Sequence, residues 1–73
     1  MTPAQCRAAR ALIDMSQAAL AGHAVAPVAV IADYEAGVSV PRANNLDAIR
    51  AALEPAGVEF IEQDGVRMQK GWR

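Results

Sequence analysis

Aromatic residues are scarce in this sequence, which has one Phe, one Tyr and one Trp and an aromatic content of 4%. The hydrophobic content is nevertheless 53%, so most apolar side chains are those of Ala, Val, Leu and Ile. Alanine dominates residues 4–36 and 48–56, and it favours helices because it loses no side-chain entropy on entering one. The composition therefore predicts a mostly helical domain with a core of small aliphatic side chains.

Reactive side chains are also few, since Cys6 is the only cysteine and His23 the only histidine. One cysteine excludes an internal disulfide. No third group is placed in the sequence to orient Cys6 and His23 for nucleophilic chemistry, so we do not expect an enzyme. We expect Cys6 to be a core residue and His23 to lie at the surface or near a helix end. Metal-ligand spacings and phosphate-binding glycine loops are absent, so neither a metal nor a cofactor is expected.

The sequence has no long apolar run, because Asp33 and Glu35 interrupt its most apolar region. A membrane span needs roughly 18 such residues, and the first residues lack the basic flank and apolar stretch of a signal peptide. We therefore expect a soluble, cytoplasmic protein with no membrane partner. A chain of 73 residues closes one core, which predicts a single domain over residues 1–73.

Positive charge is missing from the middle of the chain. The net charge is −1, and no Lys or Arg occurs from Ala11 to Pro41. Non-specific affinity for nucleic acid comes mainly from Lys and Arg, so this distribution is unfavourable for phosphate binding.

Helix start and stop signals divide the first three quarters of the chain. Thr2, Pro3 and Gln5 form a capping-box pattern, Ser16 is a good N-cap, and Pro27 suits the first turn of a helix that Gly37 ends. Asn44 or Asn45 is the expected cap of a last helix that ends before Gly57. The predicted helices span residues 3–14, 17–24, 28–36 and 45–55.

The remaining segment changes to a two-residue period and predicts a β-hairpin over residues 58–68 with an Asp-Gly turn. An isolated hairpin is marginally stable in water, so it should pack on the helices or on another copy of the chain. Its apolar residues are expected to form a homodimer interface, and they are Val58, Phe60, Ile61, Val66 and Met68.

Three stretches together resemble a known family: the run from Ser16 to Ala21, the Pro27-initiated helix containing residues 31–37, and Pro41-Arg42. They resemble the Cro/C1-type (XRE, lambda-repressor-like) helix-turn-helix family, and residues 52–61 look like the ending of a short bacterial subgroup with a C-terminal hairpin. The resemblance implies a lambda-repressor-like four-helix domain followed by a β-hairpin. It also implies a transcription regulator that binds DNA as a homodimer.

The same resemblance implies roles for individual residues. Core positions would be Leu20, Ala21, Ile31, Tyr34 and Leu46. An Arg10–Glu35 pair would hold the first helix against the third, a structural role that we favour over DNA contact. Gln17 would donate to a DNA phosphate, or else remain a solvated first-turn residue or a partner for a helix end. The residues expected to contact DNA are Gln17, Val28, Ala29, Asp33, Arg42 and Asn44.

The expected recognition helix departs from the family pattern because residues 27–30 are Pro, Val, Ala and Val, which have no polar side-chain atoms. Val28 and Ala29 would touch thymine methyl groups, Asp33 would accept from a cytosine amine, and Arg42 and Asn44 would hold the backbone. An alternative is a protein-binding regulator, such as an antiactivator or an antitoxin-like modulator, that presents Val28 to Val30 to another protein. A third option buries this patch against the chain's own tail.

Overall fold

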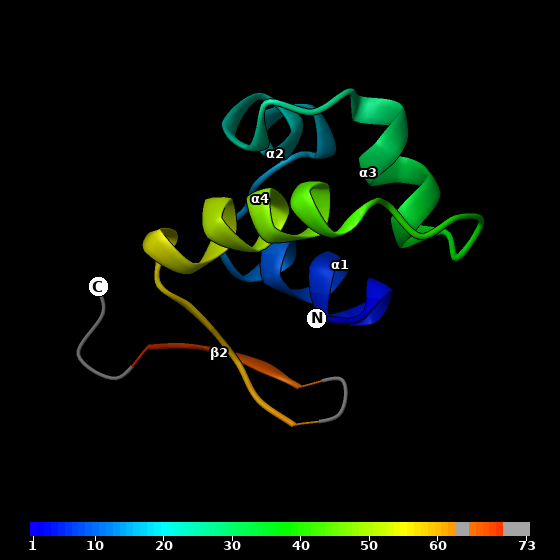
Figure 1. Ribbon diagram of the computed structural model, residues 1–73. Helices are drawn as coiled ribbons and strands as arrows, with labels where there is room; N and C mark the ends of the chain where they lie inside the picture. The colour runs from blue at the N-terminus through cyan, green and yellow to red at the C-terminus, as the bar shows by residue number, and fades with distance from the viewer. Residues whose placement is uncertain (63–64, 70–73) are drawn as a thin grey trace.

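The computed structural model describes residues 1–62 and 65–69. Within them the protein has four α-helices, one 3₁₀ turn and a two-stranded antiparallel hairpin (Figure 1). The elements are α1 (Pro3–Leu12), α2 (Gln17–Ala24), α3 (Val28–Glu35), α4 (Ala43–Leu53), η1 (Glu54–Ala56), β1 (Val58–Phe60) and β2 (Val66–Met68). The prediction of a four-helix domain followed by a C-terminal hairpin is confirmed. No helix in this described part combines the length and apolarity needed to cross a membrane.

The first two helices begin where their capping residues predict. The Thr2 side chain accepts from the Gln5 N–H at 3.1 Å, and the Gln5 side chain accepts from the Thr2 N–H at 2.9 Å, which completes the capping box. Ser16 caps α2 by accepting from the Ala19 N–H at 3.0 Å. Helix α1 ends at Leu12, two residues before the predicted boundary, and Asp14 takes a left-handed backbone with φ 55°.

The predicted start of α4 is wrong, because neither Asn44 nor Asn45 caps it. The helix begins at Ala43, and the carbonyl of Arg42 accepts from the N–H groups of Asn45 and Leu46, both at 3.0 Å. Ala43 enters the helix at little cost, so the helix extends past the two asparagines. No side chain caps this first turn, and the N–H groups of Ala43 and Asn44 have no acceptor among the described residues.

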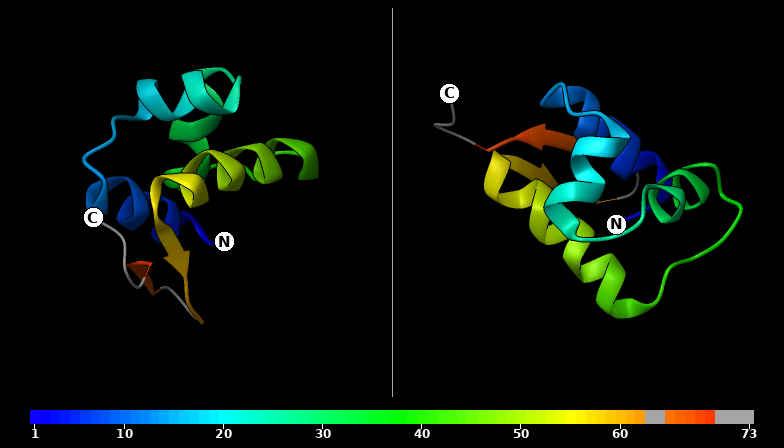
Figure 2. Two further views of the ribbon diagram at one scale, coloured as in Figure 1. Left: turned by 90° about the vertical axis from the view of Figure 1, so that its left-hand side faces the viewer. Right: turned by 90° about the horizontal axis from the view of Figure 1, so that it is seen from above.

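The core is built from side chains of all four helices and of β1. Helix α4 packs mainly on α2, while α1 packs on α3 and on the hairpin (Figures 1 and 2). Four of the five predicted core residues are buried, and Leu46 is half-buried against them. The largest fully buried side chains include Cys6, which was expected in the core, and they are Cys6, Leu20, Ile31, Ile49, Leu53 and Val58.

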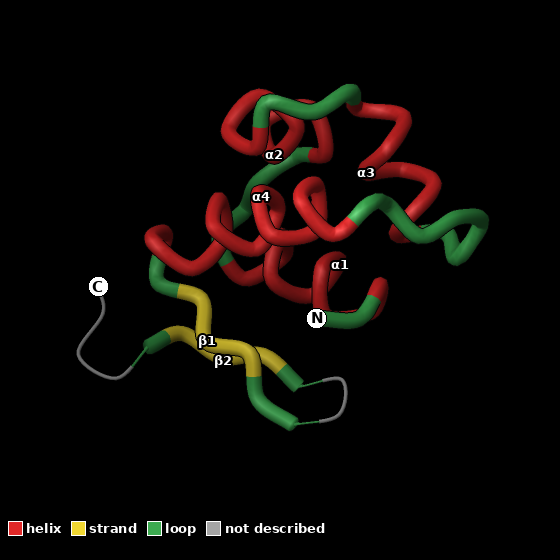
Figure 3. The backbone as a smooth tube through the Cα atoms, in the orientation of Figure 1, coloured by secondary structure: helices red, strands yellow, loops and turns green. Residues whose placement is uncertain are grey.

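The hairpin packs on α1 of its own chain (Figure 3). Its register pairs Val58 with Met68, Glu59 with Arg67 and Phe60 with Val66, so the apolar partners share one face of the sheet. Phe60 and Val66 pack on the core, and Val58 is 0% exposed. Val58 is therefore a core residue, which corrects its assignment to a dimer interface.

Gln5 fastens this hairpin to the start of α1. Its amide nitrogen donates to the carbonyl of Ile61 at 2.7 Å and to that of Gly65 at 2.9 Å. The side chain is 4% exposed, and both of its amide hydrogens and its oxygen are used. One buried glutamine thus joins the helix cap to the two sides of the hairpin turn. The central turn residues 63 and 64, where the Asp-Gly turn was predicted to begin, lie outside the described residues.

Candidate functional site

Helices α2 and α3, each eight residues long, are joined by a three-residue turn over residues 25–27. Helix α2 ends in a Schellman pattern, in which the Ala26 N–H donates to Ala21 at 3.0 Å and the Val25 N–H to Gly22 at 3.3 Å. Val25 occupies the left-handed position with φ 53° and ψ 51°, where glycine is usual. Pro27 then directs the chain into α3 as its N-cap. The two helices are consequently set at an angle at one side of the molecule (Figure 2).

The outer face of α3 carries the residues that the sequence predicts to contact a partner. Val28 is 48% exposed, and Ala29, Asp33 and Ala36 are exposed as well. Val30 is half-buried. In the described part of the chain nothing covers this face, so the option of a patch buried against the chain's own tail finds no support there. Among residues 1–62 and 65–69, this face has one charge, that of Asp33, and no cation.

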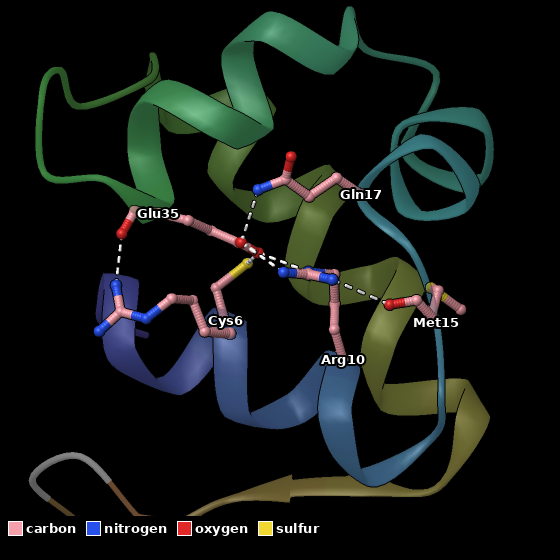
Figure 4. A network of polar contacts seen from close by, with 6 residues as sticks. Cys6, Arg10, Met15, Gln17 and Glu35 are labelled. Carbon is pink, nitrogen blue, oxygen red and sulfur yellow. Dashed lines mark hydrogen bonds and ion pairs between the residues drawn. The ribbon is translucent and has the colours of Figure 1, made fainter.

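The inner face of α3 is fixed by the carboxylate of Glu35, which is 3% exposed (Figure 4). Arg10 binds it in a bidentate manner, with Nε 2.7 Å from one oxygen and a terminal nitrogen 2.6 Å from the other. Gln17 donates to it at 2.9 Å and the Cys6 thiol at 3.1 Å. Arg7 adds a hydrogen bond to the carbonyl of Glu35. The predicted Arg10–Glu35 pair is therefore confirmed, and it lies in a network that joins α1, α2 and α3.

The network holds Glu35 ionised and Cys6 protonated. Burial alone would raise the pKa of Glu35, but hydrogen bonds from Arg10, Gln17 and Cys6 outweigh it and lower this pKa. Burial, with the hydrogen bond to Glu35, raises the pKa of the Cys6 thiol from 9.0 to about 12. Since a thiolate is the reactive form of cysteine, Cys6 has a structural role at neutral pH.

Gln17 is engaged by this network, which limits its predicted contact with phosphate. One N–H of its side-chain amide donates to Glu35. A primary amide has a second N–H, and no described residue accepts from it. Gln17 therefore binds the last residue of α3, a contact that none of the sequence alternatives named, and it has one donor left for a ligand.

The loop from Gly37 to Arg42 runs beside the end of α3 and leads into α4. Val38 and Val40 are 72% and 79% exposed, and Arg42 and Asn44 are exposed at the start of α4. The side chain of Arg42 makes no hydrogen bond or ion pair within residues 1–62 and 65–69. Its guanidinium therefore remains available beside the uncapped first turn of α4.

The other arginines of the described region are engaged elsewhere. Arg50 pairs with Glu54 at 3.0 Å and lies over the ring of Phe60, and Arg67 pairs with Glu59 at 2.5 Å on the outer face of the hairpin. The predicted site residues Val28, Ala29, Asp33, Arg42 and Asn44 thus lie on exposed parts of α3 and the start of α4, whereas Gln17 lies behind them.

Sequence reasoning missed two features of α2 and α3: the left-handed residue that ends α2 and two of the hydrogen-bond donors to Glu35. Val25 was not identified as a left-handed residue, although a helix ending three residues before the next helix begins requires a tight reversal. The donors that Cys6 and Arg7 direct at Glu35 were also missed, because they are 29 and 28 residues away from it in sequence.

Compared with known proteins, the chain matches no model of a protein family and no curated protein sequence.

Proposed function

We propose that this protein is a small DNA-binding transcription regulator of the helix-turn-helix kind, with α3 placed in the major groove. The proposal rests mainly on one observation: α3 has an exposed, uncovered outer face while Glu35 locks its inner face to α1 and α2. A helix that enters a groove must project from the body of the protein and keep a fixed orientation. The resemblance to the Cro/C1-type family supports the same proposal.

Phosphate contacts would come from the beginning of α4. The N–H groups of Ala43 and Asn44 have no acceptor among the described residues, and helix N-termini attract anions because of such free donors and the helix dipole. Arg42 lies beside them with its guanidinium available, and Asn44 is exposed on the same turn. Such contacts position a protein on DNA without reading sequence.

The homodimer remains a prediction, with a smaller interface than the sequence indicates. Val58 is buried and Phe60, Val66 and Met68 are half-buried on the inner face of the hairpin. Two features remain available to contact a second copy of the chain. One is Ile61, which is 41% exposed, and the other is the outer edges of β1 and β2, which in the described part pair only with each other. Sedimentation at tens of micromolar, repeated with Ile61→Asp, tests this; a wild-type protein that sediments as a monomer contradicts it.

The test of DNA binding compares two arginines in a binding assay with the DNA upstream of the protein's own gene. Arg42→Ala should weaken binding and reduce the slope of log affinity against log salt by about 1. Arg67→Ala is the matched control, because Arg67 is an exposed arginine on the hairpin, and it should leave the slope unchanged. Absence of binding at low salt, or equal losses in both variants, contradicts the proposal.

A second candidate function is favoured by the exposed valines. Val25, Val28, Val38 and Val40 are 48–90% exposed around α3, and among the described arginines only Arg42 has a side chain without a partner. This surface suits an apolar protein partner, as in an antiactivator or an antitoxin-like modulator. If this is the function, Val40→Asp should abolish binding to a purified partner, whereas the DNA proposal predicts little change in DNA affinity beyond the added negative charge.

A further inference from the structure

The outer face of α3 presents an unusual set of groups for a helix that would read DNA. Ala29 and Asp33 are one helical turn apart and lie along one line, and Val28 is beside them at 48% exposed. The one side-chain donor within α3 is the Tyr34 hydroxyl, which is buried and donates to the carbonyl of Met1 at 2.8 Å. The exposed face therefore offers methyl groups and one acceptor, and no donor.

Base edges in the major groove differ in what they require from a protein. Guanine presents two acceptors and needs a donor, whereas cytosine presents an amine donor and thymine a methyl group. Adenine presents both an acceptor and a donor, which suits the amide of Asn or Gln. Methyl groups and a carboxylate match thymine and cytosine, and a carboxylate repels the acceptors of guanine.

We infer that α3 reads thymine methyl groups through Val28 and Ala29 and a cytosine amine through Asp33. This inference rests on the proposed DNA-binding function and adds the base identities to it. The Asp33 side chain has no partner in the described part of the chain, and its carbonyl accepts from the N–H of Val38 at 2.9 Å. The backbone at Asp33 is thus held by the following loop while the carboxylate remains free to meet a base.

Asp33 also accounts for how specificity arises in a protein with few cations. A carboxylate in the groove is repelled by nearby phosphates, and the repulsion is offset where a cytosine amine donates to it. Asp33 therefore lowers affinity for DNA in general and discriminates against sites without cytosine at one position. Asp33→Asn should raise non-specific affinity and change the preferred base from cytosine to adenine, because an amide can accept from and donate to adenine.

The main experiment selects binding sites from a randomised duplex library with three proteins. The native chain should enrich cytosine at one position of the site, and Asp33→Asn should enrich adenine there. Each preference should be about 5-fold to 150-fold over the other bases. Asp47→Asn is the matched control, since Asp47 is an exposed aspartate of α4, and it should give the site of the native chain. Thermal melts of both variants confirm that they are folded.

A second measurement tests the thymine contacts. Replacing a contacted thymine by uracil removes only the methyl group, and the native chain should then bind about 3-fold to 4-fold more weakly. In Val28→Ser this loss should shrink towards none at the thymine that Val28 contacts. Recovery of no site by the native chain at low salt overturns the proposed function and this inference with it. Recovery of a site whose base preference is the same for Asp33→Asn, or whose affinity is unchanged by uracil, overturns the inference alone.

Discussion

Replacing Val25 by glycine should make the protein more stable. Val25 has φ 53° and ψ 51° at the end of α2, and a β-branched residue rarely takes this left-handed backbone. The side chain is 90% exposed, so it contributes almost no burial that the substitution would remove. The Schellman hydrogen bonds from the N–H groups of Val25 and Ala26 involve only the backbone and are retained.

Two opposing contributions determine the size of the effect. The left-handed conformation costs an L-residue about 1–2 kcal/mol, and a glycine there avoids this cost. Glycine also increases the entropy of the unfolded chain, which lowers stability by about 0.5–1 kcal/mol. With the middle of each range, about 1.5 and about 0.75 kcal/mol, the net gain in the free energy of unfolding is about 0.75 kcal/mol. In a domain of this size it raises the melting temperature by about 2–8 °C.

The assay is thermal and urea unfolding followed by circular dichroism, with Val40→Gly as the matched control. Val40 is also a highly exposed valine, at 79%, but its backbone does not have a positive φ. Val40→Gly should therefore lose about 0.5–1 kcal/mol. If Val25→Gly is destabilised as much as Val40→Gly, the strain assigned to Val25 is absent and the reasoning is refuted.

Three further predictions concern the buried polar groups. Arg10→Met should lower the free energy of unfolding at neutral pH by about 3–5 kcal/mol, because it leaves Glu35 buried without its main partner. The lowered pKa of Glu35 in the native protein stabilises the fold above the unfolded pKa of about 4.3, and this contribution disappears as pH falls through the folded pKa. Urea unfolding at pH values from 7 to 3 should show the free energy of unfolding of the native protein falling more steeply than that of Arg10→Met. Parallel curves for the two proteins would contradict this prediction. The raised pKa of Cys6 stabilises the fold below pH 9.0, and this contribution is lost as pH rises from 9.0 towards about 12. The free energy of unfolding of Cys6→Ala should therefore fall less between these pH values than that of the native protein. An equal fall in both proteins would contradict the raised pKa. Gln5→Glu should cost about 1–3 kcal/mol and speed amide exchange in the hairpin, because a carboxylate faces two carbonyls in place of a donor, whereas Gln69→Glu at an exposed position should do neither.

The helices were predictable to the extent that their signals are local. The capping box of Thr2 and Gln5 and the cap at Ser16 act within four residues, and both helices begin where these signals place them. The start of α4 was not predictable in this way. A cap preference of about 1 kcal/mol is small beside the packing of Ile49 and Leu53, which are both 0% exposed and fix the helix as a whole.

The candidate site was predicted as a set of residues but not as an arrangement. The resemblance to the Cro/C1-type family is what singled out Val28, Ala29 and Asp33, as residues of an expected recognition helix. It cannot show that Gln17 turns towards Glu35, because that contact joins residues 18 positions apart. The assignment of Val58 to a dimer interface failed for the same reason: alternation places Val58 on one face of the strand, and only packing on the helices decides that this face is internal.

The two contacts of Gln5 with the hairpin connect residues 56 and 60 positions apart, and they determine when the fold can be completed during synthesis. A chain leaves the ribosome from its N-terminus, so the four helices emerge before Val58 and Gly65 do. Until then α1 lacks the apolar face that covers it, and the buried amide of Gln5 lacks its acceptors. A nascent chain of this protein would expose that side of α1 until both strands of the hairpin, Val58–Phe60 and Val66–Met68, have been translated.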